Sequence, residues 1–214
     1  ALSRQEIHND ALLGVLAARL RENLHRLQPH HLVTACKAFA HLRYENEEFW
    51  TAAPQKILSF RTQLNPQQLQ TVAWAFAVRG RPGTQLYLTI AHQAQALMPR
   101  FKPVHIAITV WSFGKQGYQQ PALLTAAAAA MRANMDRFTT RNIANALWGF
   151  ARLDWKDEAL YKEAADRAAA ILSDPEGRDA VQVVDAATGR EAYRDSEGRL
   201  VHRWRDPGTG KVME

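Results

Sequence analysis

The sequence predicts an all-α protein that forms an α-solenoid, a stack of similar helix-turn-helix units, followed by a short tail. Two observations lead to this prediction. A 14-residue segment occurs four times, and its copies begin 37 residues apart at Pro29, Pro66, Pro103 and Thr140. The central phenylalanine of the segment, first seen at Phe39, keeps the same step through all four copies. A fixed period of this length is typical of repeat arrays.

Each copy of the segment has the pattern of an amphipathic helix that opens its unit. Proline suits the first helical position, because its missing N–H would have no partner there. Asn65 and Thr139 stand just before two of the copies and are good N-cap residues. From Leu32 the apolar residues recur at positions 35, 36 and 39, on one helix face. We therefore expect four first helices, of which the second and third end near Gly80 and Gly117.

The remainder of each period predicts a second helix. It carries a large apolar pair at the same spacing, namely Phe49-Trp50, Leu86-Tyr87, Leu123-Leu124 and Leu160-Tyr161. Leu12 and Leu13 stand 37 residues before the first of these pairs, so the chain begins inside a half-repeat. The predicted solenoid covers residues 1–172, divided into a half-repeat at 1–27 and repeats at 28–64, 65–101, 102–138 and 139–172. Because one unit cannot bury its apolar face alone, neighbouring units must stack into a continuous core.

Residues 173–214 differ in composition from the repeats. The helical pattern breaks between Ser173 and Gly177, and short segments then alternate with turn signals such as Thr188-Gly189 and Pro207-Gly208. This pattern predicts a β-hairpin-like or extended C-terminal tail. A lone hairpin is marginally stable in water, so we expect the tail to dock on the last repeat or on a partner.

The runs around the phenylalanine of the later repeats carry a family resemblance. They read Ala73-Trp74-Ala75-Phe76-Ala77, Val110-Trp111-Ser112-Phe113-Gly114 and Leu147-Trp148-Gly149-Phe150-Ala151. Together with the 37-residue unit, they resemble the octotricopeptide repeats and the similar heptatricopeptide repeats found beside RAP domains, over roughly four fifths of the chain. The first repeat departs from this pattern, with Lys37 where the others carry tryptophan.

The resemblance implies an α-solenoid that binds RNA in an organelle. That organelle would be the mitochondrion or the plastid, and we prefer the mitochondrion. No RAP domain is recognisable in the tail, so the nuclease-like activity associated with RAP domains is not expected.

Basic residues are concentrated in the repeats. Residues 1–173 hold 20 Lys and Arg against 12 Asp and Glu, whereas residues 174–214 hold 7 against 9. Between residues 49 and 153, eleven basic residues face a single acidic one, Asp136. Such an array attracts polyanions, because neutralising phosphates supplies most non-specific nucleic-acid affinity. The alternative is a basic face that serves only solubility.

The face of the first helices opposite the core carries the candidate RNA contacts. At 100° per residue from Leu32, it contains positions 30, 34, 37 and 41 and their equivalents. Polar residues that vary between units suit readout of unstacked bases. We predict RNA base contacts by His30, His31, Thr34, Gln67, Gln68, Thr71, His105, Asn142 and Asn145. We predict RNA phosphate contacts by Lys115, Arg141, Arg152, Arg79 and Arg81. Val104 and Ile108 make the third unit a poor reader, so a four-base code is not expected.

Trp74, Trp111 and Trp148 occupy one position of this face in three successive repeats. A residue that recurs in every unit usually does the same work in every unit, and that work is usually packing. Packing between adjacent first helices is therefore the favoured role of these tryptophans. Stacking on RNA bases is the alternative, because aromatic platforms do bind single strands.

The sequence contains no pattern for catalysis or for metal binding. The single cysteine, Cys36, excludes an internal disulfide and falls on the core face of its helix. His30 and His31 are adjacent and point about 100° apart, with no further ligand at suitable spacing. Nucleophile elbows, phosphate loops and metalloprotease pairs are not found. We therefore expect no enzyme activity, no cofactor, no metal and no small-molecule substrate. No apolar run is long enough to span a membrane.

We accordingly expect an RNA-binding helical-repeat protein of an organelle, acting without catalysis as a ribosome-associated or RNA-processing and RNA-stabilising factor. Its expected partners are single-stranded RNA or rRNA, together with proteins of a larger assembly. The alternative is a protein-interaction scaffold, a structural subunit of a large organellar assembly, because solenoids also bind proteins.

Overall fold

The structure is a computed structural model, and it describes residues 9–60, 63–80 and 83–173 together with five short strands between residues 181 and 213. The chain divides into two compact units, Ala1–Ala164 and Ala165–Glu214. The boundary between them falls inside the last helix, α9 (Glu158–Ser173). Each unit is described by itself.

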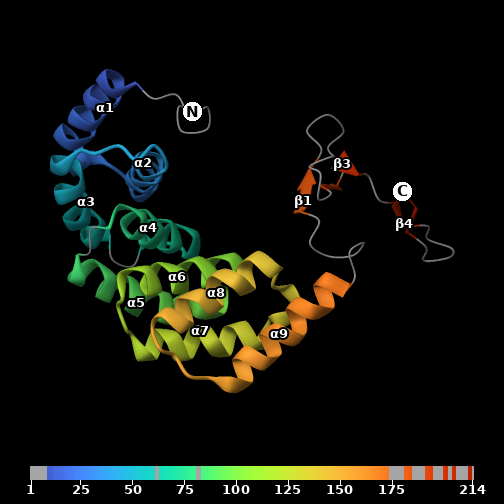
Figure 1. The fold of residues 1–214 in the computed structure, drawn as a ribbon. Helices are drawn as coiled ribbons and strands as arrows, with labels where there is room; N and C mark the ends of the chain where they lie inside the picture. The colour runs from blue at the N-terminus through green and yellow to red at the C-terminus, as the bar shows by residue number, and fades with distance from the viewer. Residues whose placement is uncertain are drawn as a thin grey trace. The chain divides into compact units, whose positions relative to one another are not determined.

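Unit 1 consists of two layers of helices that alternate along the chain (Figure 1). The layer of first helices contains α2 (Pro29–His41), α4 (Pro66–Arg79), α6 (Pro103–Gln116) and α8 (Thr140–Arg152). The other layer contains α1 (Asp10–Glu22), α3 (Glu47–Phe60), α5 (Thr84–Leu97) and α7 (Pro121–Ala133). Short 3₁₀ turns follow α1, α5 and α7, at Leu24–Arg26, Met98–Arg100 and Met135–Arg137.

Within each layer, every one of these helices packs against the next helix of the same layer. The prediction of an all-α protein built from repeating helix pairs is therefore confirmed. The first helices begin at the four residues that the 37-residue period predicts, and α1 precedes them as a lone helix.

The ends of the first helices repeat as regularly as their beginnings. The side chains and backbones of Asn65 and Gln68 cap each other reciprocally at the start of α4. A residue with left-handed backbone follows every first helix, at the same 37-residue step: Arg43 (φ 52°), Gly80 (φ 67°), Gly117 (φ 70°) and Asp154 (φ 53°). Glycine adopts this conformation without steric cost, so the helix ends predicted at Gly80 and Gly117 are confirmed.

The phenylalanine of each repeat lies buried between the two layers. No more than 3% of any of them is exposed: Phe39, Phe76, Phe113 and Phe150. Aromatic residues of the second helices meet them edge to face, a favourable geometry for aromatic rings. Trp50 lies 5.2 Å from Phe76, and Tyr87 lies 5.0 Å from Phe113, measured between ring centroids.

Replacing Phe76 or Phe113 by alanine should lower the free energy of unfolding by about 3–5 kcal/mol, because each lies in an interior repeat with neighbours on both sides. Denaturant unfolding measures this loss. A loss below about 1 kcal/mol would mean that these rings do not form the core of the stack.

Small residues flank each of these phenylalanines and let neighbouring first helices approach closely. The flanking pairs are Ala38 and Ala40, Ala75 and Ala77, Ser112 and Gly114, and Gly149 and Ala151. A Cβ on Gly114 would lie 2.7 Å from the Cα of Gly149. A Cβ on Gly149 would lie 2.5 Å from the carbonyl oxygen of Val110. Backbone thus lies against backbone between α6 and α8, with no room for one methyl group.

Gly149→Ala should therefore destabilise unit 1 by about 1–3 kcal/mol, because the added methyl meets helix backbone that cannot move alone. The matched control is Gly14→Ala in α1, where a Cβ would be in ordinary contact at 3.6 Å from the Tyr44 hydroxyl. That control should gain about 0.5–1 kcal/mol from the better helix propensity of alanine. Equal effects of the two substitutions in thermal or denaturant unfolding would refute the close approach.

Unit 2 contains the C-terminal half of α9 and two small antiparallel sheets. The first sheet has the order β1 (Val181–Val184), β2 (Glu191–Arg194) and β3 (Leu200–Val201). β1 pairs with β2 through Val181 opposite Arg194, and β2 pairs with β3 through Arg194 opposite Leu200. The second sheet pairs β4 (Trp204–Arg205) with β5 (Val212–Met213). Docking of this tail on the last repeat or on a partner stays a prediction.

Candidate nucleic-acid interface

The stripe predicted to face away from the core does so in all four first helices. We call it the outer stripe, and it comprises His30, Thr34, Lys37 and His41 in α2, Gln67, Thr71, Trp74 and Val78 in α4, Val104, Ile108, Trp111 and Lys115 in α6, and Arg141, Asn145, Trp148 and Arg152 in α8. None of these residues is buried. The outer stripe is thus a continuous solvent-facing surface that crosses the four first helices.

Aromatic and basic side chains meet on the outer stripe between neighbouring helices. The rings of Trp111 and Trp148 lie 5.8 Å apart, and the Lys115 ammonium lies 5.6 Å from the Trp111 ring centroid. Between α2 and α4, the rings of His41 and Trp74 lie 4.5 Å apart. Burial, followed by the charge of Lys37, lowers the pKa of His41.

The three tryptophans differ in exposure. Trp74 and Trp111 are partly buried by neighbouring first helices, which supports packing as their main role. Trp148 lies on α8, the first helix of the fourth repeat, and is 45% exposed. Stacking of an RNA base stays a prediction for all three, and Trp148 has the most ring surface to offer.

Two of the predicted base-contacting residues also cap helices. The Gln68 side chain accepts a hydrogen bond from the Asn65 N–H at 3.0 Å. The Nδ1 atom of His105 accepts one from the Lys102 N–H at 3.2 Å. Burial and then the nearby charge of Lys102 lower the pKa of His105, which favours the neutral ring that a hydrogen bond accepted by Nδ1 requires. This capping role has a signal in the sequence, because Gln68 and His105 are polar residues that stand three positions after an N-cap residue.

The other predicted base-contacting residues lie near the start of the first helices. His30, His31, Thr34 and Gln67 are exposed, whereas Thr71, Asn142 and Asn145 are partly exposed. The Thr71 hydroxyl donates to the Gln67 carbonyl at 2.7 Å, so it can serve a base only as an acceptor. The rings of His30 and His31 lie 3.9 Å apart, and in the part of the chain that the structure describes no group of three or more metal-ligating residues occurs.

The predicted phosphate-contacting residues fall into three groups. Lys115, Arg141 and Arg152 are exposed on the outer stripe, where a polyanion could reach them. Arg81 lies outside the described residues. Arg79 differs from both, because only 7% of its side chain is exposed.

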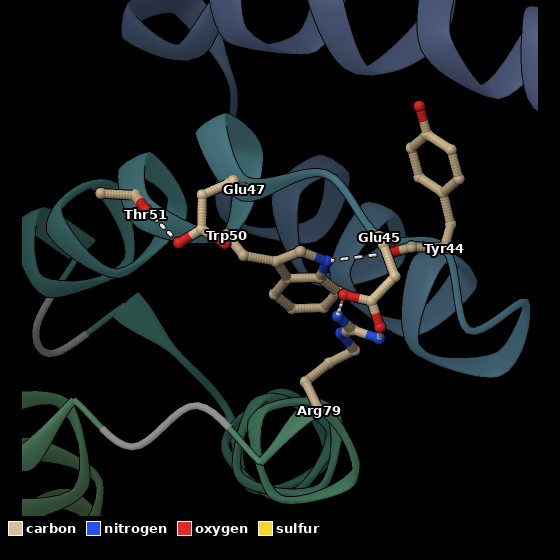
Figure 2. Close-up of polar contacts among 6 residues, drawn as sticks. All are labelled: Tyr44, Glu45, Glu47, Trp50, Thr51 and Arg79. Carbon is tan, nitrogen blue, oxygen red and sulfur yellow. Dashed lines mark hydrogen bonds and ion pairs between the residues drawn. The ribbon is translucent and has the colours of Figure 1, made fainter.

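Arg79 ties α4 to the loop between α2 and α3 (Figure 2). Its guanidinium donates to both carboxylate oxygens of Glu45 and lies over the Trp50 ring, 5.5 Å from the centroid. The Trp50 indole N–H in turn donates to the Tyr44 carbonyl at 3.2 Å. This cluster occupies the fork of the guanidinium, which would have to leave Glu45 to bind a phosphate in the same way.

Arg79→Ala should lower the free energy of unfolding by about 1–3 kcal/mol, because it removes a charge-assisted pair between two repeats and the packing of a guanidinium that is only 7% exposed, although its partner Glu45 is 70% exposed. It should leave RNA affinity and its salt dependence unchanged. Denaturant unfolding and RNA titration of the same variant separate the two effects. A normal stability combined with a reduced salt slope would instead make Arg79 a phosphate contact.

Comparison with protein families gives a match over most of the chain. Residues 1–202 match the family model described as RESC6: RNA-editing substrate-binding complex 6 protein. The chain belongs to the RESC6 family. No curated protein matches the chain.

RESC6 membership associates the chain with the RNA-editing substrate-binding complex and with organellar RNA processing. It supports the mitochondrial alternative of the sequence-based prediction. It gives no support to a plastid location, to ribosome association or to the octotricopeptide family itself. Among the described residues, no helix is both long and apolar enough to cross a membrane.

Proposed function

We propose that this RESC6 chain holds single-stranded RNA on its outer stripe, as a subunit of the RNA-editing substrate-binding complex in the mitochondrion. Phosphates bind Lys115, Arg141 and Arg152, while Asn142 and Asn145 reach the edges of unstacked bases. The chain supplies binding and positioning to the complex, and catalysis is left to other proteins.

The observation that carries the proposal is the distribution of charge. Eleven basic residues and one acidic residue lie between positions 49 and 153, and the exposed ones on the outer stripe stand beside half-exposed indole rings. Interleaved cations and aromatic rings suit single-stranded RNA, because the cations track the backbone and the rings accept bases. The family description, which names an RNA-editing complex that binds substrates, supports the same conclusion.

The alternative is a scaffold that holds other subunits, with RNA bound elsewhere in the complex. A subunit of an assembly must contact protein as well as RNA, so the two roles are compatible. They differ in whether the isolated chain binds RNA in a salt-dependent way through the outer stripe.

Lys115→Ala, Arg141→Ala and Arg152→Ala should each weaken binding to every single-stranded RNA alike. Each should also lower the slope of log affinity against log salt by about 0.7, the value of one phosphate contact on a single strand. Asn145→Ala should change the preference among RNA sequences and leave the salt slope as it is. The measurement is titration of several single-stranded RNAs at several salt concentrations.

The matched control is Arg19→Ala, which removes a basic residue from α1, in the other helix layer, where 75% of the side chain is exposed. It should bind RNA like the parent protein. If all four outer-stripe variants also bind like the parent, the outer stripe is not the RNA site and the scaffold role becomes the better conclusion.

A further inference from the structure

Among the described residues of unit 1, one side of α8 is not covered by another first helix, although its equivalent is covered in α2, α4 and α6. We call the side of a first helix that meets the next first helix its trailing face. In α8 it comprises Ala144, Leu147, Trp148 and Ala151, and the equivalent residues of α6 are Ala107, Val110, Trp111 and Gly114. The contact of Gly149 in α8 with Val110 and Gly114 in α6 identifies this face.

Exposure shows how the faces differ. Ala107 is 0% exposed in α6, whereas its equivalent Ala144 is exposed in α8. Ala40 and Ala77 are 1% and 0% exposed in α2 and α4, whereas their equivalent Ala151 is exposed. The next first helix covers these residues in α2, α4 and α6. Within the described ranges, no fifth first helix follows α8.

The trailing face of α8 is not built as a cap. Terminal units of repeat arrays usually present a polar outer face, because that face meets water. At the other end of the layer, the leading side of α2 carries the exposed polar residues His31 and Thr34 beside the partly exposed Ala38. The α8 face presents alanine, leucine and tryptophan instead, with Trp148 45% exposed. A contiguous apolar surface of this kind marks an interaction site.

We propose that the trailing face of α8 binds an α-helix of another subunit of the RNA-editing substrate-binding complex, which packs on it as a fifth first helix. The proposal rests on the proposed function, because it needs the chain to act inside that complex. The partner helix would pack on α8 in the way that α8 packs on α6, and this geometry defines which residues it must present. The partner helix presents a glycine, alanine or serine to Ala151, as Gly149 is presented to Gly114.

A second copy of the chain that docks head to tail, through its own α2, does not fit this place. A copy docked through its own α2 would bring its α1 to the position beside α7. The start of α9 already holds that position, where Arg132 and Glu163 form an ion pair at 2.8 Å between α7 and α9. The helix that covers the trailing face must therefore come from a partner that places no helix of its own at the position of α9.

The test uses a helical peptide that copies a first helix of this chain. A fluorescent peptide of residues 102–117 is stapled between the positions of Trp111 and Lys115, which leaves its leading side free. The staple is needed because isolated helices of this length are marginal in water. Titration with the full chain, followed by fluorescence anisotropy, should give saturable binding at one peptide per chain.

Two matched changes locate the contact. Ala151→Leu in the full chain should weaken peptide binding about tenfold or more, because it fills the space that the partner backbone needs. In the peptide, Ser112→Leu should weaken binding to the parent chain to a similar degree for the same reason. Ala151 is exposed at the end of α8, so the variant should keep its circular dichroism spectrum and its unfolding midpoint.

Other outcomes overturn the proposal. Absent or unsaturable peptide binding, or binding that neither substitution weakens, rejects a helix-binding face. Sedimentation that shows a dimer abolished by Ala151→Leu assigns the face to a second copy. Loss of RNA affinity in Trp148→Lys, which copies the Lys37 of α2, with no peptide binding, assigns the face to an RNA base. Salt-dependent RNA titration of the Ala151→Leu chain is run in parallel and should match the parent, so failure of this proposal is distinguishable from failure of the RNA site.

Discussion

Unit 1 is organised by the distance at which one first helix can lie on the next. Helix axes pack about 8–10 Å apart, and the residues at the contact set the value within that range. Small residues on both sides of each repeat phenylalanine let neighbouring first helices pack near the short end of this range. The contact of Gly114 with Gly149 shows this most clearly. The chain returns to this layer after the same 37 residues each time, and the phenylalanine fills the space between the layers in each unit.

Polar side chains at the ends of the first helices then lock neighbouring units together. Arg79 pairs with Glu45, and the equivalent residue Gln116 donates to the Ala77 carbonyl at 2.9 Å. The same position of the repeat thus links its unit to the preceding unit in both cases, once through an ion pair and once through a hydrogen bond to a backbone carbonyl. A residue that varies between repeats is therefore not automatically free to read a ligand. Gln68 and His105 illustrate the same point, since their side chains are engaged at the starts of α4 and α6.

The sequence was sufficient for the fold because the period and the buried phenylalanine are both local, repeated signals. It also identified the outer stripe, since solvent exposure follows from helical geometry once Leu32 is placed on the core. The sequence could not predict the partner of Arg79. Glu45 has no equivalent carboxylate in the next repeat, and an ion pair between repeats has no periodic signature. The sequence also did not predict the left-handed backbone of Arg43 and Asp154, because glycine is the residue that indicates this conformation.

Two surfaces of α8 meet at Trp148, and this sets a constraint on how RNA and protein can use them. In the helical projection Trp148 lies between the outer stripe and the trailing face, whereas Arg141 and Arg152 lie farther toward the outer stripe. A helix seated on the trailing face would partly bury Trp148, as α8 partly buries Trp111. Stacking of a base on Trp148 and docking of a helix beside it are then competing events, while phosphate contacts to the arginines remain open in both states. Occupancy of one surface would lower the affinity of the other through this single shared ring, which is how a subunit of an assembly can couple RNA binding to its protein contacts.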